Sequence, residues 1–257
     1  MSETKSLSKF FEEIAEAAAA ATLPFFRTQM NIDNKEAGGF DPVTEADKSA
    51  ERAIRAIIER DYPQDGIHGE EYGLVRESAA RRWVIDPVDG TRAFISGLPT
   101  WGTLVGLTEN NVAIAGLMAQ PFTGETFIAD GHNAVRQWRG QVADLRVSGV
   151  RNLRDAKMFT TSPHLFQGDL RRQFDALETQ VKMSRYGTDC YAFAMLAAGF
   201  ADVVIDPGLK PYDIVALIEQ AGGVVTTLDG ERAENGGDII AAATPELHEA
   251  AMEHMRG

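Results

Sequence analysis

The chain opens with apolar residues that are spaced for one face of a helix. Between residues 7 and 21 they recur three or four positions apart, the periodicity of an amphipathic α-helix. The members of this face are Leu7, Phe10, Phe11, Ile14, Ala17, Ala18 and Ala21. The pattern predicts a helix that ends near Pro24. The polar, glycine-bearing segment 31–42 then predicts a loop that can swing over a site.

A second helix is predicted over residues 44–63. Thr44 is a favourable N-cap, and Asp47 follows three residues later, as in a capping box. The apolar residues expected on the inner face are Ala50, Ala53, Ile54, Ile57 and Ile58.

Apolar runs divided by turn residues predict a sheet in the rest of the first half. Residues 65–73 combine a short strand with an acidic turn, and residues 83–85 indicate a buried strand. Residues 102–130 hold further apolar runs separated by the turn sequences TEN and FTGE. We therefore expect two helices followed by a meander that is mostly antiparallel.

The second half changes to an alternation of strands and helices. Strands are expected at 156–162, 181–187, 201–206, 224–230 and 238–244, and helices at 167–180, 189–199, 211–223 and 245–255. Such alternation is typical of layered α/β proteins. The composition changes near residues 140–155, but no linker rich in Pro, Gly or Ser occurs there. We therefore expect one domain over 1–257 with two lobes, 1–145 and 146–257.

Composition and charge narrow the function classes. Of 257 residues 44% are hydrophobic, which is enough for a large core, and the formal net charge of -13 disfavours nucleic-acid binding. The single cysteine, Cys190, cannot form an intrachain disulfide, which fits a reducing compartment. A buried thiol is favoured over a reactive one.

Glutamates interrupt the first apolar stretch, so neither a signal peptide nor a membrane span is indicated. A cytoplasmic protein is therefore expected.

The stretch DPVDGT, residues 86–91, ends the buried strand 83–85 with two acids. Two carboxylates at a strand end repel each other unless a cation lies between them, and Mg²⁺ takes such oxygen ligands. An Asp-Pro pair is also typical of a type I turn. These six residues alone leave both interpretations open.

Other acids fall at the ends of predicted elements, namely Asp47, Glu70, Glu71 and Asp213. Each alone has a structural explanation, as a helix cap, a solvated turn charge or a first-turn acid. Together with Asp86, Asp89 and the hydroxyl of Thr91 they predict a two-metal site, which suits the hydrolysis of phosphate esters. The backbone N–H groups near Gly90 and Thr91 can bind a phosphate.

Four segments resemble the motifs of the inositol monophosphatase family. They are DPVTEAD at 41–47, GEE at 69–71, WVIDPVDGTRAF at 83–94 and LKPYDIVALIEQAGG at 209–223, in the family order and over nearly the whole chain. The resemblance implies an αβαβα sandwich, two or three Mg²⁺ ions, a phosphate monoester as substrate and a homodimer.

The resemblance also implies roles for individual residues by matching position. The implied metal ligands are Glu70, Asp86, Asp89, Asp213 and the backbone carbonyl of Val88. The implied catalytic residues are Asp47 and Thr91, which orient and deprotonate the attacking water, together with Glu70. The implied substrate-binding residues are Asp89, Gly90, Thr91, Gly187, Thr188, Asp189 and Asp206.

Three departures from the usual inositol phosphatase pattern resemble the histidinol-phosphate phosphatase branch. They are RAF after DGT, Tyr212 in place of a tryptophan, and GTDCYAF at 187–193 with Asp189 in place of a small residue. Histidinol phosphate carries an ammonium and an imidazole, with which Asp189, helped by Asp206, can pair. The alternative is that Asp189 caps the helix beginning at Cys190.

The hypothesis is a Mg²⁺-dependent phosphatase that hydrolyses L-histidinol phosphate in histidine biosynthesis. The near rivals are an inositol-1-phosphate phosphatase and a nucleotide 3'-phosphatase of the same superfamily. A rival of another class is a non-catalytic metal- or phosphate-binding module, against which the intact acids and Thr91 argue. Arg92, Arg185 and Lys210 lie near the motifs, where they can steer phosphate or balance acids.

Overall fold

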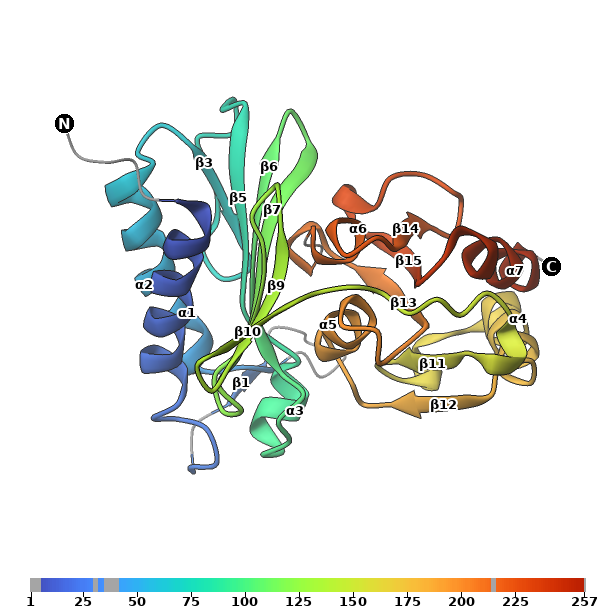
Figure 1. The fold of residues 1–257 in the computed structure, drawn as a ribbon. Helices are drawn as coiled ribbons and strands as arrows, with labels where there is room; N and C mark the ends of the chain where they lie inside the picture. The colour runs from blue at the N-terminus through green and yellow to red at the C-terminus, as the bar shows by residue number, and fades with distance from the viewer. Residues whose placement is uncertain (1–5, 30–31, 35–41, 214–215, 257) are drawn as a thin grey trace.

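A computed structural model describes residues 6–29, 32–34, 42–213 and 216–256 of the chain. Helices and sheets alternate in five layers, with a sheet in each gap between helical layers (Figure 1). The helical layers are α1 (Leu7–Thr22) with α2 (Glu45–Asp61), α5 (Tyr191–Ala197) with α6 (Leu217–Gln220), and α4 (Gly168–Glu178) with α7 (Pro245–Arg256). The expected layered α/β fold is therefore confirmed.

The first sheet lies between the α1–α2 layer and the α5–α6 layer. Its strand order is β10-β9-β8-β7-β6-β5-β3-β4, and all described pairs are antiparallel except β3 with β5. The strands are β3 (Gly66–Gly69), β4 (Gly73–Val75), β5 (Arg81–Asp89), β6 (Gly102–Glu109), β7 (Val112–Gln120), β8 (Glu125–Ala129), β9 (Ala134–Trp138) and β10 (Gln141–Asp144). The mostly antiparallel meander expected here is confirmed, with β9 and β10 as additional strands.

The second sheet lies between α5–α6 and α4–α7. Its order is β12-β11-β13-β15-β14, in which β11 runs parallel to β12 and β13 while the other pairs are antiparallel. The strands are β11 (Lys157–Thr160), β12 (Met183–Tyr186), β13 (Val203–Leu209), β14 (Val224–Thr227) and β15 (Gly237–Ala242). The five strands expected in the second half are confirmed, and all of them belong to this sheet.

Helix α2 begins where the sequence predicts. The side chain of Thr44 accepts from the N–H of Ala46, and the Asp47 carboxylate accepts from the N–H of Thr44, which completes the capping box. The inner faces of α1 and α2 pack on the first sheet around Trp83. Burial of each large apolar side chain here stabilises the fold by roughly 1.5–3 kcal/mol. Ala53 and Ile57 are only partly buried, because Glu51 shares the inner face instead.

Two expectations differ from the structure or fall partly outside it. Residues 211–213 form the 3-10 turn η3 rather than the start of an α-helix, because the Asp213 carboxylate accepts from the N–H of Lys210 and closes a tight turn. Within segment 31–42, β1 (Asp33–Asn34) pairs with β2 (Pro42–Val43). Residues 35–41, which carry most of the expected loop, lie outside the described part of the chain.

The remaining elements are short. They are the helix α3 (Thr91–Ile95) and the 3-10 turns η1 (Leu153–Asp155), η2 (Pro163–Leu165), η3 (Pro211–Asp213) and η4 (Ala233–Asn235).

Candidate active site

The acids of DPVD lie in a bulge at the end of strand β5. Asp86 is opposite Leu104 of β6, whereas Asp89 is opposite Gly102, so the two residues between them on β5 face a single residue of β6. In a regular strand, residues three apart point to opposite faces; the extra residue brings both carboxylates to one side. Pro87, which has no N–H to donate, occupies the bulge. The type I turn interpretation of DPVD is therefore wrong.

Three carboxylates meet at this strand end. One oxygen from each of Asp86, Asp89 and Asp213 lies within 4.8 Å of the others. Asp213 reaches the cluster from the second half of the chain, on η3, where the N–H of Lys210 donates to its Oδ2 at 2.7 Å. Glu70, in the turn after β3, lines the same cavity. The structure thus brings together the side chains of all four acids that the resemblance implied as ligands.

Burial makes this cluster electrostatically unfavourable without a counter-charge. The pKa of Asp89 is raised to about 7 and that of Asp213 to about 6, mainly by burial, with the charges of neighbouring acids contributing to the rise. The pKa of Asp86 is raised well above its ordinary value by burial and then by the charges of Glu70, Asp89 and Asp213. A bound cation would remove this penalty.

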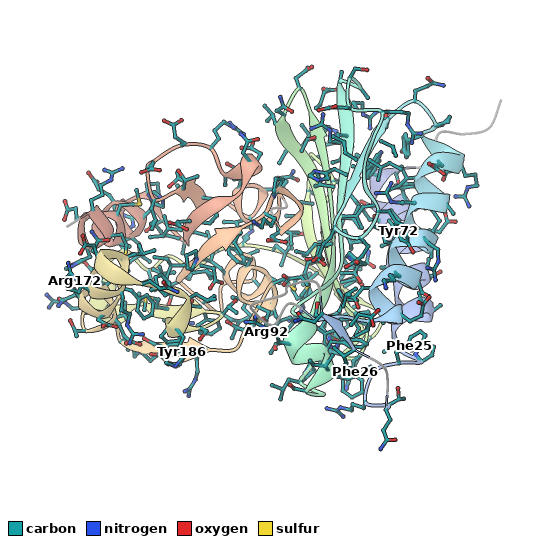
Figure 2. The ribbon with its side chains drawn as sticks, turned by 180° about the vertical axis from the view of Figure 1, so that it is seen from behind. Phe25, Phe26, Tyr72, Arg92, Arg172 and Tyr186 are labelled. Carbon is teal, nitrogen blue, oxygen red and sulfur yellow. The ribbon has the colours of Figure 1, made fainter. Side chains whose placement is uncertain are left out.

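The cavity over the cluster has a volume of about 260 Å³ and lies where the two halves of the chain meet. Its lining residues are Glu70, Asp86, Val88, Asp89, Gly90, Thr91, Arg92, Thr161, Asp189, Lys210 and Asp213. Arg92, labelled in Figure 2, lies at the junction between the halves. With Lys210 it places positive charge at the rim of an otherwise acidic site, which suits an anionic substrate.

Thr91 lines the cavity, and the buried Asp47 lies next to it. Thr91 is the first residue of α3, and its Oγ1 is 3.1 Å from the carbonyl oxygen of Val88 and 3.4 Å from Oδ1 of Asp47. The other oxygen of Asp47 accepts from the hydroxyl and N–H of Thr44. Asp47 is 1% exposed, and burial raises its pKa. Asp47 therefore caps α2 with one oxygen and faces Thr91 with the other.

Gly90 permits the close packing of two separate segments. It has a φ of 78°, and a Cβ there would lie 2.9 Å from the Cβ of Asp189 and 3.2 Å from the Cα of Trp101. Both a positive φ and lack of space therefore require glycine. The N–H of Cys190 donates to Asp89 Oδ2 at 2.7 Å, so the start of α5 also holds a carboxylate of the cluster.

Asp189 lines the cavity and does not act as the helix cap. The N-cap of α5 is Cys190, with no side-chain capping bond, and Asp189 Oδ2 instead accepts from Thr100 Oγ1 at 3.2 Å. The pKa of Asp189 is raised to about 7, mainly by burial and then by the charge of Asp89. Cys190 is buried, as expected, and burial raises the pKa of its thiol well above the ordinary value.

Asp206 lies behind Thr161, a residue that the sequence did not single out. Asp206 is 1% exposed, and it accepts from Thr160 Oγ1 and the N–H of Thr161 at 2.7 Å each, and from Thr161 Oγ1 at 3.1 Å. Burial raises its pKa to about 7. Thr161 itself lines the main cavity. No sequence motif marks Thr161, because its position depends on a carboxylate 45 residues away.

Gly187 and Thr188, which directly follow β12, contact the same region. The N–H of Gly187 donates to the carbonyl of Thr161, and Thr188 Oγ1 lies 3.3 Å from the carbonyl of Thr160. Their described polar contacts therefore go to the backbone of β11 and the residue after it, and their predicted role in binding substrate stays a prediction.

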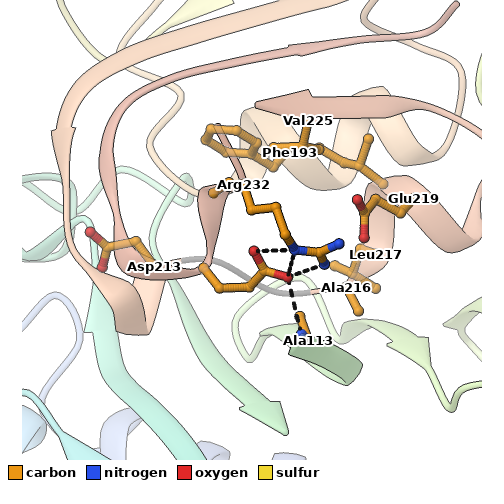
Figure 3. Close-up of a pocket in the computed structure, with 11 residues that line it drawn as sticks. Ala113, Phe193, Asp213, Ala216, Leu217, Glu219, Val225 and Arg232 are labelled. Atoms are coloured by element: carbon orange, nitrogen blue, oxygen red, sulfur yellow. Dashed lines mark hydrogen bonds and ion pairs between the residues drawn. The ribbon is translucent and has the colours of Figure 1, made fainter. Parts of the chain in front are cut away.

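Two smaller cavities adjoin the main one. The first, of about 20 Å³, is lined by Asp89, Leu104, Thr161, Asp189, Cys190, Phe193, Asp206, Leu209 and Asp213. The second, of about 50 Å³, is largely apolar, and Asp213 lies at its edge (Figure 3). There Arg232 pairs with Glu234, which also accepts from the N–H of Ala113 at 3.3 Å. Arg232 and Glu234 thus bond to each other, and the cavity is largely apolar, so the acidic cavity is the better site for chemistry.

The acidic cavity has the donors that a hard divalent cation requires. Its carboxylate oxygens come from β5, η3 and the turn after β3, and Mg²⁺ binds such oxygens in preference to nitrogen or sulfur. Asp86, Asp89, Asp213 and Glu70 would hold the ion. Among the described helices, none combines the length and apolar character that crossing a membrane requires.

Comparison with known proteins agrees with this site. The model of the inositol monophosphatase family matches residues 3–257. The chain belongs to the inositol monophosphatase family. It is 38% identical over 256 residues to the bifunctional phosphatase IMPL2 of Arabidopsis thaliana, covering 94% of this chain and 72% of that protein. It is 34% identical to a histidinol-phosphatase of Streptomyces coelicolor, covering 94% of each protein.

A solved structure of an inositol monophosphatase from Zymomonas mobilis has the same fold. Its TM-score is 0.85 at 36% identity, with 97% of each chain covered. Members of the inositol monophosphatase family are generally metal-dependent, which agrees with the acid cluster. The chain is thus a phosphoric monoester hydrolase of this family, as the resemblance implied.

Proposed function

We propose that the chain hydrolyses L-histidinol phosphate to L-histidinol and phosphate with Mg²⁺ as cofactor, in histidine biosynthesis. The observation that carries the choice of substrate is Asp189, a carboxylate that lines the cavity next to Gly90. A second acid beyond the metal ligands favours a substrate with a cationic group. The histidinol-phosphatase of Streptomyces coelicolor supports the same branch.

In the proposed mechanism, the residues of the first half prepare the attack on phosphorus. Glu70, Asp86, Asp89, Asp213 and the carbonyl of Val88 would hold two or three Mg²⁺ ions, which would supply Lewis-acid activation of water and neutralise negative charge on the phosphate. The Asp47 carboxylate and the Thr91 hydroxyl orient the water and accept its proton, because Thr91 lines the cavity and its hydroxyl lies beside Asp47. The N–H groups at the start of α3, near Gly90 and Thr91, bind a phosphate oxygen.

The residues of the second half select the leaving alcohol. Asp189 pairs with the ammonium or imidazolium of histidinol, while Asp206 acts through Thr161. Because the Thr161 hydroxyl donates to Asp206, its lone pairs remain to accept a hydrogen bond from the substrate. Acceptors at both positions favour a leaving group that carries N–H donors.

The structure of the Zymomonas mobilis inositol monophosphatase supports a second function, the hydrolysis of inositol 1-phosphate. The metal chemistry would be the same, and only the alcohol would differ. Inositol is uncharged, so Asp189 would then contribute less to binding.

A comparison of three substrates tests the proposal. We predict that kcat/KM for L-histidinol phosphate exceeds that for inositol 1-phosphate and for a nucleotide 3'-phosphate. A hydrogen bond between charged groups contributes about 1.5–3 kcal/mol, so Asp189→Asn should lower kcat/KM for histidinol phosphate by roughly 10- to 100-fold. The same variant should change the rate on inositol 1-phosphate much less. Equal losses on both substrates, or a wild-type preference for inositol phosphate, would overturn the substrate assignment.

We further propose that the two lobes act as one catalytic unit in a cytoplasmic homodimer. The cluster takes Asp86 and Asp89 from the first lobe and Asp213 from the second, which supports one unit. The family resemblance supports the dimer. Light scattering coupled to gel filtration measures the assembly, and a mass near 28.0 kDa would show a monomer instead.

A further inference from the structure

A fully buried carboxylate lies on α2 beside the turn that carries Glu70. Glu51 is 0% exposed, and it accepts from the N–H of Glu71 at 2.7 Å and from the N–H of Tyr72 at 3.2 Å. Arg55, one helical turn later, donates its Nε to Glu51 at 2.7 Å. A buried carboxylate is costly unless it is paired and hydrogen-bonded, and these three donors meet that requirement.

Arg55 holds the same turn from its other end. Its second guanidinium nitrogen donates to the carbonyl of Gly73, the first residue of β4. Glu51 thus binds the N–H groups of the turn, and Arg55 binds a carbonyl. Tyr72, labelled beside α2 in Figure 2, adds a surface contact, because Arg52 donates to its hydroxyl.

Gly69 leaves room for the Glu51 carboxylate. A Cβ at Gly69 would lie 1.9 Å from Oε1 of Glu51, so no larger residue fits without displacing the carboxylate. Gly69 is the last residue of β3 and precedes Glu70 directly. The glycine and the buried acid therefore fit each other.

Glu70 is held between two elements. Its own N–H donates to the carbonyl of Ile85 on β5, directly before Asp86. On the other side, Glu51 holds the next two residues of the turn. Asp47 lies one helical turn before Glu51 on the same face of α2, so one helix sets the positions of Asp47 and Glu70 together.

We infer that Glu51 is a positioning residue that fixes Glu70 at the metal-binding cavity. The inference rests on the proposed role of Glu70 as a ligand. Loss of the Glu51 carboxylate should weaken metal binding through Glu70 and leave the ligands on β5 and η3 in place. The loss should therefore appear in metal affinity more than in kcat at saturating Mg²⁺.

A double-mutant cycle with Glu51→Gln and Glu70→Gln tests this inference. Binding of Mn²⁺ alone is measured by electron paramagnetic resonance, without substrate. We expect Glu51→Gln to weaken Mn²⁺ binding at least about fivefold when Glu70 is present, but less than about twofold in the Glu70→Gln background, because coupled residues are not additive. Glu59→Gln, on the exposed face of α2, is the matched control and should change nothing.

Two results would overturn the inference. One is unchanged Mn²⁺ affinity in a folded Glu51→Gln chain, and the other is the same loss with and without Glu70. Circular dichroism checks folding. If Glu51→Gln does not fold, Arg55→Lys takes its place in the cycle, with a smaller expected loss that must also vanish with Glu70→Gln. Phosphate release is assayed in parallel, so failure of the proposed function is seen separately from failure of this cycle.

Discussion

The hydroxyl of Thr91 has two oxygen neighbours that limit the chemistry it can perform. It lies between the carbonyl of Val88 and the carboxylate of Asp47, at the wall of the acidic cavity. A hydroxyl placed in this way can pass a proton from water to Asp47, and general base catalysis contributes about 10²–10⁴-fold to a rate.

Thr91→Val keeps the shape of the side chain and removes its hydroxyl. We predict a fall in kcat of at least about 100-fold with Mn²⁺ affinity nearly unchanged, because no implied carboxylate ligand is removed. Thr91→Ser restores a hydroxyl and should recover most of the rate. Steady-state kinetics with metal titration measures both. Equal activity of the valine and serine variants would contradict a role for the hydroxyl.

At the scale of elements, the turn from β5 into α3 shapes the site. The bulge places Asp86 and Asp89 on one side, and Gly90 then turns the chain at a φ of 78° into α3. The same turn leaves room for Asp189 from the second half. The geometry of this one connection therefore affects both the acid cluster and the part of the cavity wall that Asp189 lines.

Gly90→Ala tests this connection against a matched glycine. Gly124 also has a positive φ, of 72°, but a Cβ there would meet no atom within 4 Å. Both alanines carry a backbone penalty of about 1–2 kcal/mol, but only Gly90→Ala adds a clash with Asp189 and Trp101. We predict a fall in kcat/KM of at least about tenfold for Gly90→Ala and near wild-type kinetics for Gly124→Ala. Similar kinetics for both variants would show that the close approach is unimportant.

Elements with local signals could be predicted from the sequence, and elements that depend on distant contacts could not. The α2 cap is local, since Thr44 and Asp47 are three residues apart, and it is confirmed. Strands β9 and β10 were missed because their residues are mostly half-buried or exposed and lack a clear alternation. The 3-10 turn at 211–213 was missed because the N–H of Lys210 donates to the Asp213 carboxylate, and this side-chain hydrogen bond competes with helix formation.

In the candidate site, too, residues with local sequence signals could be predicted, and residues that depend on distant contacts could not. Asp86, Asp89, Glu70 and Asp213 could be selected because acids at element ends form a recognisable set of motifs. Glu51 could not, because its partners are backbone N–H groups 20 and 21 residues away, which no local pattern marks. Sequence motifs therefore identify the acids that line the cavity, and the structure adds a residue such as Glu51 that holds the turn beside them.

For the whole molecule, the acid cluster links stability to pH and to metal. Below pH about 4 an aspartate is protonated in both the folded and the unfolded chain. From there up to the raised pKa values of Asp213, about 6, and Asp89, about 7, the folded chain retains protons that the unfolded chain has released. The contribution of these two groups to the free energy of unfolding therefore falls as pH rises through this window.

We predict that the melting temperature of the metal-free chain falls between pH 5 and pH 8 relative to that of the Asp89→Asn variant. One kcal/mol corresponds to about 2–4 °C for a chain of this size, so the difference should reach several degrees. Mg²⁺ should raise the melting temperature more at pH 8 than at pH 5, because the cation replaces those protons. Differential scanning calorimetry measures the melting temperature of each chain at pH 5 and at pH 8, with and without Mg²⁺. A variant with the same pH dependence as the wild type would contradict the linkage.

In the proposed mechanism, hydrolysis of the phosphate ester requires metal held by this acid cluster. The most direct measurement is phosphate release from L-histidinol phosphate by the metal-depleted chain while Mg²⁺ is titrated back, with Asp89→Asn in parallel. We predict no turnover without metal, recovery with Mg²⁺ in the wild type, and a rate at least about 100-fold lower in the variant. Turnover that survives metal removal, or full activity of Asp89→Asn, would contradict it.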